Sequence, residues 1–371
     1  MKKICIIDED GRYGGPQSRM IQIASKLKND FDFKFIIPKN DTDYFEKKLK
    51  LNSLSYKKIF LTRLTLQKTV FLKYILFFIY EILSLIKIFK KEKFDIIQIN
   101  STPQFKAAIV CIILKLRPIW IIEDSYSNAL VKFTFQILAK LSNAKIIYTS
   151  KIVREFYFNK MVSKNNSVII PASVDESLFK INNKSYKPSF IQNDKFIIAM
   201  ISSIIPVKGV LEYLRLVDQI LKKRNDIQFL LLGPTIESQK KYTRTVLEKI
   251  NLINKKNFHY QFGIVDTKNI LNFSDLFICT SKSEGGPLTC CEALLMGVPV
   301  LTTRVGIMPE VIRNEFNGFI YENLDDAYNF INILVDNKQM LNDMKNNCTS
   351  LNYKFELKNI YIKYKEIYNY F

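Results

Sequence analysis

Short β-branched runs alternate with longer amphipathic stretches along nearly the whole chain, a pattern typical of parallel sheets covered by helices. In the first half, the predicted strands are Lys3–Ile7, Phe33–Ile37, Lys58–Leu61, Asp95–Ile99, Ile119–Ile122, Lys145–Tyr148 and Ser167–Ile170. Apolar residues recur at helical spacing between them, and the predicted helices are Gln17–Lys28, Leu66–Lys91, Pro103–Lys115, Ser127–Leu141 and Lys151–Phe158. The first half is therefore predicted to be one α/β unit.

The alternation restarts after a polar segment, Pro171 to Asp194, whose prolines, asparagines and serines indicate a linker. The predicted strands beyond it are Phe196–Ile201, Gln228–Leu232, Asn257–Gln261, Leu276–Cys279, Val298–Thr302 and Gly318–Tyr321. The predicted helices are Gly209–Lys223, Lys240–Ile250, Leu288–Met296 and Ala327–Val335, followed by a one-faced helix in the tail, Glu356–Tyr370. Because a domain holds roughly 100–200 residues, we expect two Rossmann-like domains, residues 1–175 and 176–352, facing each other across a cleft.

The chain is basic, with 55 Lys+Arg against 35 Asp+Glu and a formal net charge of +20. Residues 1–180 hold 31 of the basic and 16 of the acidic residues, so +15 of this charge lies in the first half. Such a surface attracts nucleic acid, phospholipid headgroups or a pyrophosphate-bearing substrate. No nucleic-acid reading module accompanies the charge, which disfavours the first of these. A generally lysine-rich composition explains the total charge equally well, but not its uneven distribution.

Cysteine usage and the apolar segments bear on location. The six cysteines lack the CxxC spacing of a zinc site and most lie in apolar runs, which indicates reduced, buried thiols in a cytoplasmic protein. The apolar run after Met1 is too short for a signal peptide. The most apolar region, Val70 to Phe89, is interrupted by charged residues, so we expect no transmembrane anchor. Its lysines and aromatic residues suit either a core-facing helix or an interfacial helix at an anionic membrane.

The strongest local signal is SKSEGGPLTCCEA, from Ser281 to Ala293, which follows a predicted strand and opens a helix. Free N–H groups of Leu288 and Thr289 at the helix start would suit a phosphate. Carboxylates at Glu284 and Glu292 would accept hydrogen bonds from the hydroxyls of a sugar or ribose. From this chemistry alone, a capped surface helix with two solvated glutamates explains the segment equally well.

The wider pattern closely resembles the retaining family-four (group 1) glycosyltransferases, whose signature spaces two glutamates as in EGGPLTCCEALLMGVPVLTT. Five further segments match the family in order: Gly14-Gly15 (its N-terminal glycine loop), Phe94–Gln98 (usually KPDVVH), Ile170–Asp175 (IPNGVD), Pro206–Gly209 (PxKG) and Gly306–Val311 (GGxPEV). The resemblance covers most of the chain. It implies the GT-B fold, with a C-terminal helix, residues 353–371, crossing back to the first domain.

The family resemblance also implies a reaction and a site. The reaction is retaining transfer of a sugar from a nucleotide diphosphate sugar, most often UDP-linked, with no metal or other cofactor. Glu284 would bind donor-sugar hydroxyls and Lys208 would balance the leaving diphosphate, as the two catalytic residues. The other donor-binding positions implied are Glu292 at the ribose, Gly286, Pro287, Leu288 and Thr289 at the phosphates, Gly263 and Ile264 beside the base, and Gly14 and Gly15 from the first domain.

Three positions depart from the family pattern. Ser202-Ser203 replaces the Gly-Arg pair five residues before the lysine, so Ser203 stands in the donor site where the family has a second cation. Glu123-Asp124 replaces His-Asp, and with Arg12 these are the predicted acceptor-side residues. Ile307 replaces the second glycine of GGxPEV.

Weaker features have ordinary structural explanations. Arg12 and Arg19 flank the glycine loop and are candidates for the missing cation. Asp41-Thr-Asp43 has the spacing of a metal-dependent transferase, but the amphipathic stretch after it favours a helix cap. Asp8-Glu9-Asp10 ends the first strand, where acidic residues are usually solvated. His259, the only histidine, favours a half-buried structural residue.

The function predicted is sugar transfer to a carbohydrate or lipid-linked acceptor in bacterial cell-surface polysaccharide or glycoconjugate synthesis. The predicted location is the cytoplasm, peripheral on the inner face of the plasma membrane. One alternative is a nucleotide-sugar epimerase or hydrolase of the same fold, which acts without an acceptor. The other is a non-catalytic membrane-binding or polyanion-binding protein that has kept the fold.

Overall fold

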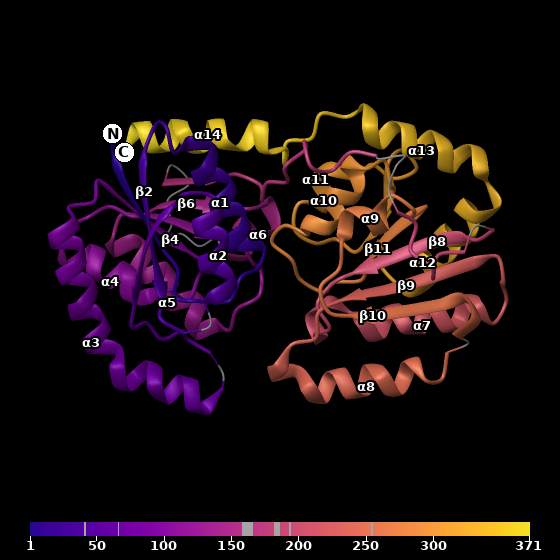
Figure 1. The fold of residues 1–371 in the computed structure, drawn as a ribbon, viewed down its shortest axis with the longest axis horizontal. Helices are drawn as coiled ribbons and strands as arrows, with labels where there is room; N and C mark the ends of the chain where they lie inside the picture. The colour runs from indigo at the N-terminus through magenta and orange to yellow at the C-terminus, as the bar shows by residue number, and fades with distance from the viewer. Residues whose placement is uncertain (41, 66, 158–165, 182–185, 193, 254) are drawn as a thin grey trace. The chain divides into compact units, whose positions relative to one another are not determined.

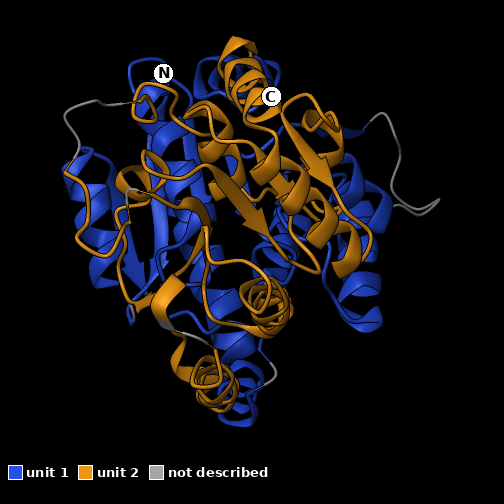
Figure 2. Cartoon of the chain, turned by 90° about the vertical axis from the view of Figure 1, so that its right-hand side faces the viewer, with its two compact units in different colours: residues 1–173, 354–371 blue, residues 174–353 orange. Residues whose placement is uncertain are grey.

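The chain divides into two compact units. The computed structural model describes residues 1–40, 42–65, 67–157, 166–181, 186–192, 194–253 and 255–371 (Figure 1). The first unit comprises residues 1–173 and 354–371, and the second comprises residues 174–353, as the colours of Figure 2 distinguish. The division after Ser173 lies two residues before the predicted one. The tail belongs to the first unit, which confirms that the C-terminal helix returns to the first domain.

A seven-stranded parallel sheet forms the centre of the first unit. Its strands are β1 (Lys3–Ile7), β2 (Asp32–Pro38), β3 (Ser55–Ile59), β4 (Ile96–Asn100), β5 (Ile119–Ile122), β6 (Lys145–Tyr148) and β7 (Ser167–Ile169), in the order β3-β2-β1-β4-β5-β6-β7. The direction of strand order reverses between β1 and β4, which pair with Ile4 opposite Ile96. In sheets of this kind, ligands bind beyond the carboxyl ends of the strands at such a reversal.

Helices cover both faces of the first sheet (Figure 1). They are α1 (Gly15–Leu27), α2 (Asp43–Leu51), α3 (Lys68–Glu92), α4 (Phe105–Ile113), α5 (Ala129–Leu141), α6 (Lys151–Tyr157) and α14 (Leu357–Tyr370). One core is formed with α1, α2 and α14, and the other with α3, α4 and α5. The apolar stripe of α14 at Leu357, Ile360, Tyr364 and Tyr368 is buried in the first of these cores, and the helix packs against α1.

The second unit repeats this plan with a six-stranded parallel sheet. Its strands are β8 (Phe196–Ile201), β9 (Ile227–Gly233), β10 (Phe258–Phe262), β11 (Leu276–Cys279), β12 (Val300–Thr302) and β13 (Gly318–Ile320), in the order β10-β9-β8-β11-β12-β13. Its helices are α7 (Val210–Leu221), α8 (Lys240–Ile250), α9 (Thr267–Leu271), α10 (Leu288–Leu295), α11 (Met308–Val311), α12 (Leu324–Asp336) and α13 (Lys338–Ser350). Single turns of 3-10 helix are η2 (Pro206–Lys208), η3 (Glu237–Gln239) and η4 (Lys255–Asn257). Strand order reverses between β8 and β11.

The predicted α/β class and alternation are confirmed, with element ends within a few residues. The helices without a sequence prediction include α9 and α11, each only one turn long, and α13, which buries only Leu341, Met344 and Cys348. Thr42 is the N-cap of α2, as the amphipathic stretch predicted, while Asp41 lies outside the described residues. Leu66 and Phe158, predicted helix ends, also lie outside them.

The expectation of no membrane-spanning segment needs correction in one respect. Among the described residues, α3 is long and apolar enough to cross a membrane, judged by length and composition alone. The sequence argument counted uninterrupted apolar runs, whereas this 25-residue helix reaches a mean hydropathy of 1.9 over 18 residues despite isolated charges. In the structure α3 packs on α4 within the first unit, in the layer that covers its sheet.

Candidate active site

The reversal between β8 and β11 brings the two strongest predicted residues into contact. The turn after β8 ends in η2 and Gly209, whose φ of 67° is in the left-handed region. A Cβ at Gly209 would lie 2.0 Å from the carbonyl oxygen of Thr280, just after β11. The Thr280 hydroxyl donates to the carbonyls of Lys208 (3.0 Å) and Gly209 (2.8 Å). The two loops are therefore fixed against each other, and only glycine allows this approach.

Lys208 and Glu284 form an ion pair across these loops. The Ser281 hydroxyl also donates to Glu284 Oε1, at 2.8 Å. The two side chains are only 25% and 13% exposed. Burial alone would lower the pKa of Lys208, but the attraction of the Glu284 carboxylate outweighs it and raises that pKa. Lys208 is therefore a fixed positive charge at neutral pH, in partly desolvated surroundings.

The start of α10 lies directly after Glu284. Pro287 is the N-cap and supplies no side-chain acceptor, and its carbonyl receives the N–H groups of Cys290 (3.0 Å) and Cys291 (3.2 Å). The N–H groups of Leu288 and Thr289 precede the first intrahelical bond, so they belong to the donors that a helix start leaves free. Together with the positive end of the helix dipole they form an anion-binding feature.

The turn at Gly306 supports this loop from behind. Gly306 has a φ of 52°, and a Cβ there would lie 2.8 Å from the Gly285 carbonyl oxygen and 2.9 Å from Cδ of Pro287. A side chain would displace the segment that leads from Glu284 into α10. Ile307, in contrast, has an ordinary right-handed conformation with φ −81° and a buried side chain. The second glycine of the family turn is therefore not required by the backbone in this chain.

Glu292 differs from Glu284 in having no partner. It lies on the second turn of α10, and within the described ranges no protein group donates a hydrogen bond to its carboxylate or pairs with it. Burial raises the pKa of Glu292 to about 7. A carboxylate held this way gains most from a ligand that supplies hydroxyl donors.

The other predicted donor residues of the second unit lie along the same carboxyl edge. Gly233, the last residue of β9, would place a Cβ 2.1 Å from the Ser202 carbonyl oxygen, and its own carbonyl accepts from the Gly263 N–H at 3.0 Å. A Cβ at Gly263 would meet nothing within 4 Å, and the adjacent Ile264 side chain is 94% exposed. Ser203, half-buried, brings no charge to this edge.

The predicted residues of the first unit lie at the carboxyl edge of its own sheet. Gly14 is the N-cap of α1, and its N–H donates to Gln17 Oε1 at 3.0 Å, while Gly15 begins the helix. A Cβ at Gly14 would make only ordinary contacts, 3.5 Å from Gln17 and 3.8 Å from Pro16. Within this unit, nothing therefore requires a glycine at position 14.

The acceptor-side candidates are all paired. Arg12 donates to both oxygens of Asp10, at 2.9 and 2.5 Å. Glu123 forms an ion pair with Arg19, which is fully buried, so Arg19 balances a carboxylate of its own unit and not an external anion. Asp124 accepts from the Tyr157 hydroxyl at 3.0 Å, and burial raises the pKa of Asp124.

Two of the three acidic residues that follow β1, Asp8 and Glu9, are buried, which corrects the expectation that they are solvated, whereas Asp10 is half-buried. Asp8 accepts from Gln17 (2.8 Å) and Gln104 (3.1 Å), and burial raises its pKa to about 7. Glu9 lies 3.4 Å from the Lys106 ammonium.

Lys106 itself is fully buried and also pairs with Glu81 of α3. Sequence reasoning missed this group, together with Thr280 and Ser281 of the second unit. Their position directly after strands was the available signal for Thr280 and Ser281, whereas nothing local identifies Glu81 or Lys106.

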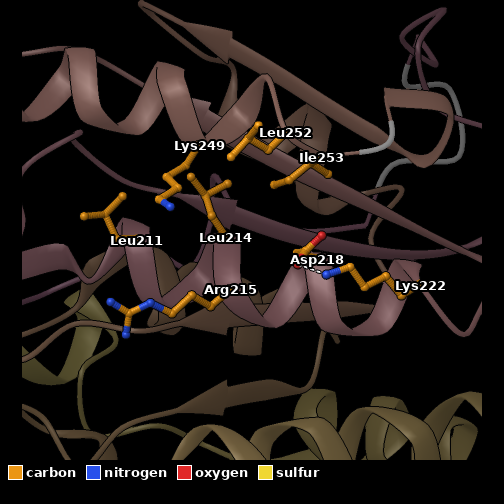
Figure 3. A pocket seen from close by; sticks show the side chains of 8 residues that line it. All are labelled: Leu211, Leu214, Arg215, Asp218, Lys222, Lys249, Leu252 and Ile253. Atoms are coloured by element: carbon orange, nitrogen blue, oxygen red, sulfur yellow. Dashed lines mark hydrogen bonds and ion pairs between the residues drawn. The ribbon is translucent and has the colours of Figure 1, made fainter.

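The structure also has a groove on the second unit, away from these loops. It lies between α7 and α8, has a volume of about 400 Å³ and is lined by Leu211, Leu214, Arg215, Asp218, Lys222, Lys249, Leu252 and Ile253 (Figure 3). Its carboxylate, Asp218, pairs with Lys222 at 2.6 Å. The groove contains none of the predicted site residues.

The sequence of the chain is similar to those of known glycosyltransferases. Residues 182–350, nearly the whole second unit, match the family described as glycosyl transferases group 1. The chain is 26% identical over 292 residues to UDP-Gal:alpha-D-GlcNAc-diphosphoundecaprenol alpha-1,3-galactosyltransferase of Escherichia coli, covering 72% of this chain and 73% of that one. It is 23% identical over 266 residues to N,N'-diacetylbacillosaminyl-diphospho-undecaprenol alpha-1,3-N-acetylgalactosaminyltransferase of Campylobacter jejuni, covering 67% of each chain.

Solved structures resemble the entire chain. Anabaena Alr3699/HepE, in complex with UDP and glucose, superposes with a TM-score of 0.80 at 18% identity over 100% of both chains. A glycosyltransferase from Rickettsia africae superposes with a TM-score of 0.79 at 19% identity, covering 99% of this chain and 98% of that one. At this level of identity the likeness establishes the fold, which is GT-B.

Proposed function

Because the chain belongs, through residues 182–350, to the group 1 glycosyltransferases, we propose that it moves a sugar from a UDP-linked donor to a saccharide or lipid-linked acceptor with retention of configuration. The observation that carries the donor site is the Lys208–Glu284 ion pair beside the open N-terminus of α10. A cation, free N–H groups and two carboxylates at one strand-order reversal suit a ligand that combines phosphate with hydroxyls.

The charges of this edge suggest a role for each residue. The diphosphate lies against Lys208 and the N–H groups of Gly286, Leu288 and Thr289, and Pro287 shapes the turn. The unpartnered carboxylate of Glu292 accepts from the ribose hydroxyls. Ile264 and Gly263, at the open end of β10, border the base, because an exposed apolar side chain next to free space suits a planar ring. Gly14 and Gly15 remain proposed donor contacts from the first unit.

Glu284 and Lys208 are the proposed catalytic residues. Transfer breaks the bond between the sugar C1 and a diphosphate oxygen and forms a bond between C1 and the oxygen of an acceptor hydroxyl. The proton of that hydroxyl leaves with the nucleoside diphosphate. Lys208 stabilises the negative charge that grows on the leaving diphosphate. Glu284, held by Lys208 and Ser281, accepts from donor-sugar hydroxyls and orients C1. Ser203 is uncharged, so within the second unit we assign the stabilisation of the leaving diphosphate to Lys208.

For the acceptor we propose a lipid-linked saccharide, made at the inner face of a bacterial plasma membrane during cell-surface polysaccharide synthesis. Two observations support this. The relatives from Escherichia coli and Campylobacter jejuni are named for undecaprenol-diphosphate acceptors, and the first 180 residues carry +15 of the +20 charge. The acceptor hydroxyl is proposed to lie near Glu123, Asp124 and Arg12. These paired residues orient the sugar and do not neutralise phosphate.

Two measurements test the proposal in order. The purified chain is first heated with a panel of UDP-, GDP- and ADP-sugars, because a ligand at 100 times its Kd adds about 2.7 kcal/mol of stability. The best donor is then incubated with and without an undecaprenyl-diphosphate-linked sugar. We expect stabilisation by UDP-sugars and release of UDP that requires the acceptor. Equal turnover without acceptor would indicate a hydrolase or epimerase, and no stabilisation by any nucleotide sugar would indicate a non-catalytic protein.

A further inference from the structure

Helix α3 is much longer than the helices beside it. Its 25 residues span about 37 Å, whereas the nine residues of its neighbour α4 span about 13 Å. The N-terminal half of α3 therefore continues past α4, as Figure 1 shows for the helix at the edge of the first unit. That half begins after β3, on the side of the carboxyl ends of the strands.

One side of α3 is apolar and faces solvent. Its exposed apolar residues are separated alternately by one and three positions, which places them on a single face about half the circumference wide. They are Phe71, Leu72, Ile75, Leu76, Ile79, Tyr80 and Leu83, each 41–75% exposed. Seven large apolar side chains on one face form a far larger exposed patch than the scattered apolar residues of an ordinary soluble surface.

The lysines of α3 are exposed to solvent, whereas its two glutamates pair with residues of the first unit. Five exposed lysines flank the apolar face toward its two ends: Lys68 and Lys73 near the start, and Lys87, Lys90 and Lys91 near the end. The two acidic residues point elsewhere. Glu81 is buried against Lys106, and Glu92 pairs with Lys3 and Lys34 at 3.1 and 2.8 Å. The solvent face thus carries only positive charge.

The base of the helix is firmly attached. Glu81 accepts from the Thr62 N–H at 3.1 Å and from its hydroxyl at 2.8 Å, in addition to the buried pair with Lys106. Phe60, just after β3, packs edge-on against Phe77 with ring centroids 4.9 Å apart. The apolar face is therefore a fixed projection of the first unit. A helix that crossed a bilayer would have to leave these contacts and expose Glu81 to lipid.

We propose that this face of α3 lies in the interface of an anionic lipid bilayer, with its apolar side chains inserted among the lipids and its lysines at the headgroups. The combination of a broad apolar face and flanking cations is typical of interfacial helices. A second copy of the chain fits less well, because pairing the two faces would bring two sets of five lysines together.

This placement rests on the proposed function only in that both put the chain at a membrane. The placement of α3 adds that attachment to the membrane is mainly apolar. Binding should therefore persist at salt concentrations that screen the charges of the lysines. Because α3 begins at the carboxyl edge of the first sheet, it would also hold Asp124 and the glycine loop near the lipid surface, where a lipid-linked acceptor is presented.

Flotation of the full chain with vesicles, without donor or acceptor, tests the inference separately from sugar transfer. The vesicles contain phosphatidylcholine alone or with about 30% phosphatidylglycerol, at about 50 and 500 mM salt. The variant Leu72→Ser/Leu76→Ser/Ile79→Ser removes the centre of the face. The control Leu178→Ser/Leu252→Ser/Ile362→Ser changes apolar residues elsewhere that are 47–75% exposed, against 64–75% for the three α3 residues. Unchanged melting temperatures and circular dichroism spectra establish that both variants are folded.

We expect the wild type and the control to float with anionic vesicles, to bind less at high salt and yet to remain measurably bound there. The α3 variant should lose at least about tenfold in binding at both salt concentrations. Equal binding of the α3 variant and the wild type would overturn the inference. So would a wild-type dimer in solution that the α3 variant converts to a monomer, or a wild-type protein that resists alkaline extraction from membranes as a spanning protein does.

Discussion

Replacing Lys208 with alanine tests the donor site most directly. The lysine is only 25% exposed, its pKa is raised by Glu284, and the neighbouring Ser203 contributes no charge. Removing one preorganised electrostatic group from a transition state typically costs about 2.7–4 kcal/mol, or 10²–10³ in rate. The substitution also leaves the Glu284 carboxylate without its counter-charge, close to the incoming diphosphate. At an effective dielectric constant of about 20, two unit charges 4 Å apart interact by about 4 kcal/mol, so we expect the upper half of this range.

The assay for Lys208→Ala measures kcat/KM from acceptor-dependent UDP release, with the Kd of UDP measured separately by calorimetry. A loss mainly in kcat is expected if the charge acts on the leaving group, whereas a loss only in UDP affinity would indicate ground-state binding. Lys282→Ala is the matched control, because Lys282 lies on the adjacent loop but is 61% exposed and pairs with Glu212 at 2.8 Å. A kcat/KM for Lys208→Ala within about threefold of wild type would refute the assigned role.

Three further predictions concern titration, stability and metals. Glu292→Gln should weaken UDP binding. Because burial raises the pKa of this half-buried carboxyl to about 7, the wild type should lose stability between about pH 4.5 and pH 7 as the group ionises, and the variant should lack that loss. Urea unfolding at several pH values measures this, and parallel pH profiles would contradict it. Lys106→Met should destabilise the chain by about 3–5 kcal/mol in urea unfolding, because it leaves Glu81 and Glu9 buried without a cation. The control Lys140→Met, at an exposed position, should cost under about 0.5 kcal/mol, and equal effects of the two variants would mean that the buried group contributes no stability. Transfer should survive EDTA because Lys208 and helix N–H groups are proposed to balance the diphosphate, and complete loss restored by Mn²⁺ or Mg²⁺ would show that a metal is required.

The residues of the second unit were predictable because each is set by a short stretch of chain. A strand, a turn and a helix start follow one another within about fifteen residues at both Lys208 and Glu284, so local pattern alone puts them at strand ends. Their contact follows from the strand order, since β8 and β11 are adjacent at the reversal. The departure at Ile307 is also explained, because the residue has a right-handed backbone and a buried side chain that need no glycine.

The first unit shows why other features were not predictable. Glu81 and Lys106 are separated by 25 residues on two helices, and Arg19 and Glu123 by 104 residues. Neither pair has a local signature, because a charged residue in an amphipathic stretch is normally solvated. Only the packing of α3 on α4 and of α1 beside β5 determines that these charges meet inside the unit. Burial of Asp8 was unpredictable for the same reason, because its hydrogen-bond donors, Gln17 and Gln104, come from distant parts of the chain.

The two strand-order reversals present different groups to a ligand, which favours donor binding at one and acceptor binding at the other. In the second unit, Lys208 and the N-terminus of α10 attract an anion, and Glu292 offers a free acceptor to hydroxyls. In the first unit, Asp8 is held by amides at the same topological position, and every cation described near it is already paired with a carboxylate. We therefore expect a diphosphate to be attracted mainly by the charges of the second edge, with only the glycine backbone at Gly14 and Gly15 as proposed contacts from the first. A neutral sugar hydroxyl can bind at the first edge, because it donates a hydrogen bond to carboxylate and amide oxygens there. Its binding brings no further negative charge next to the buried carboxyl groups.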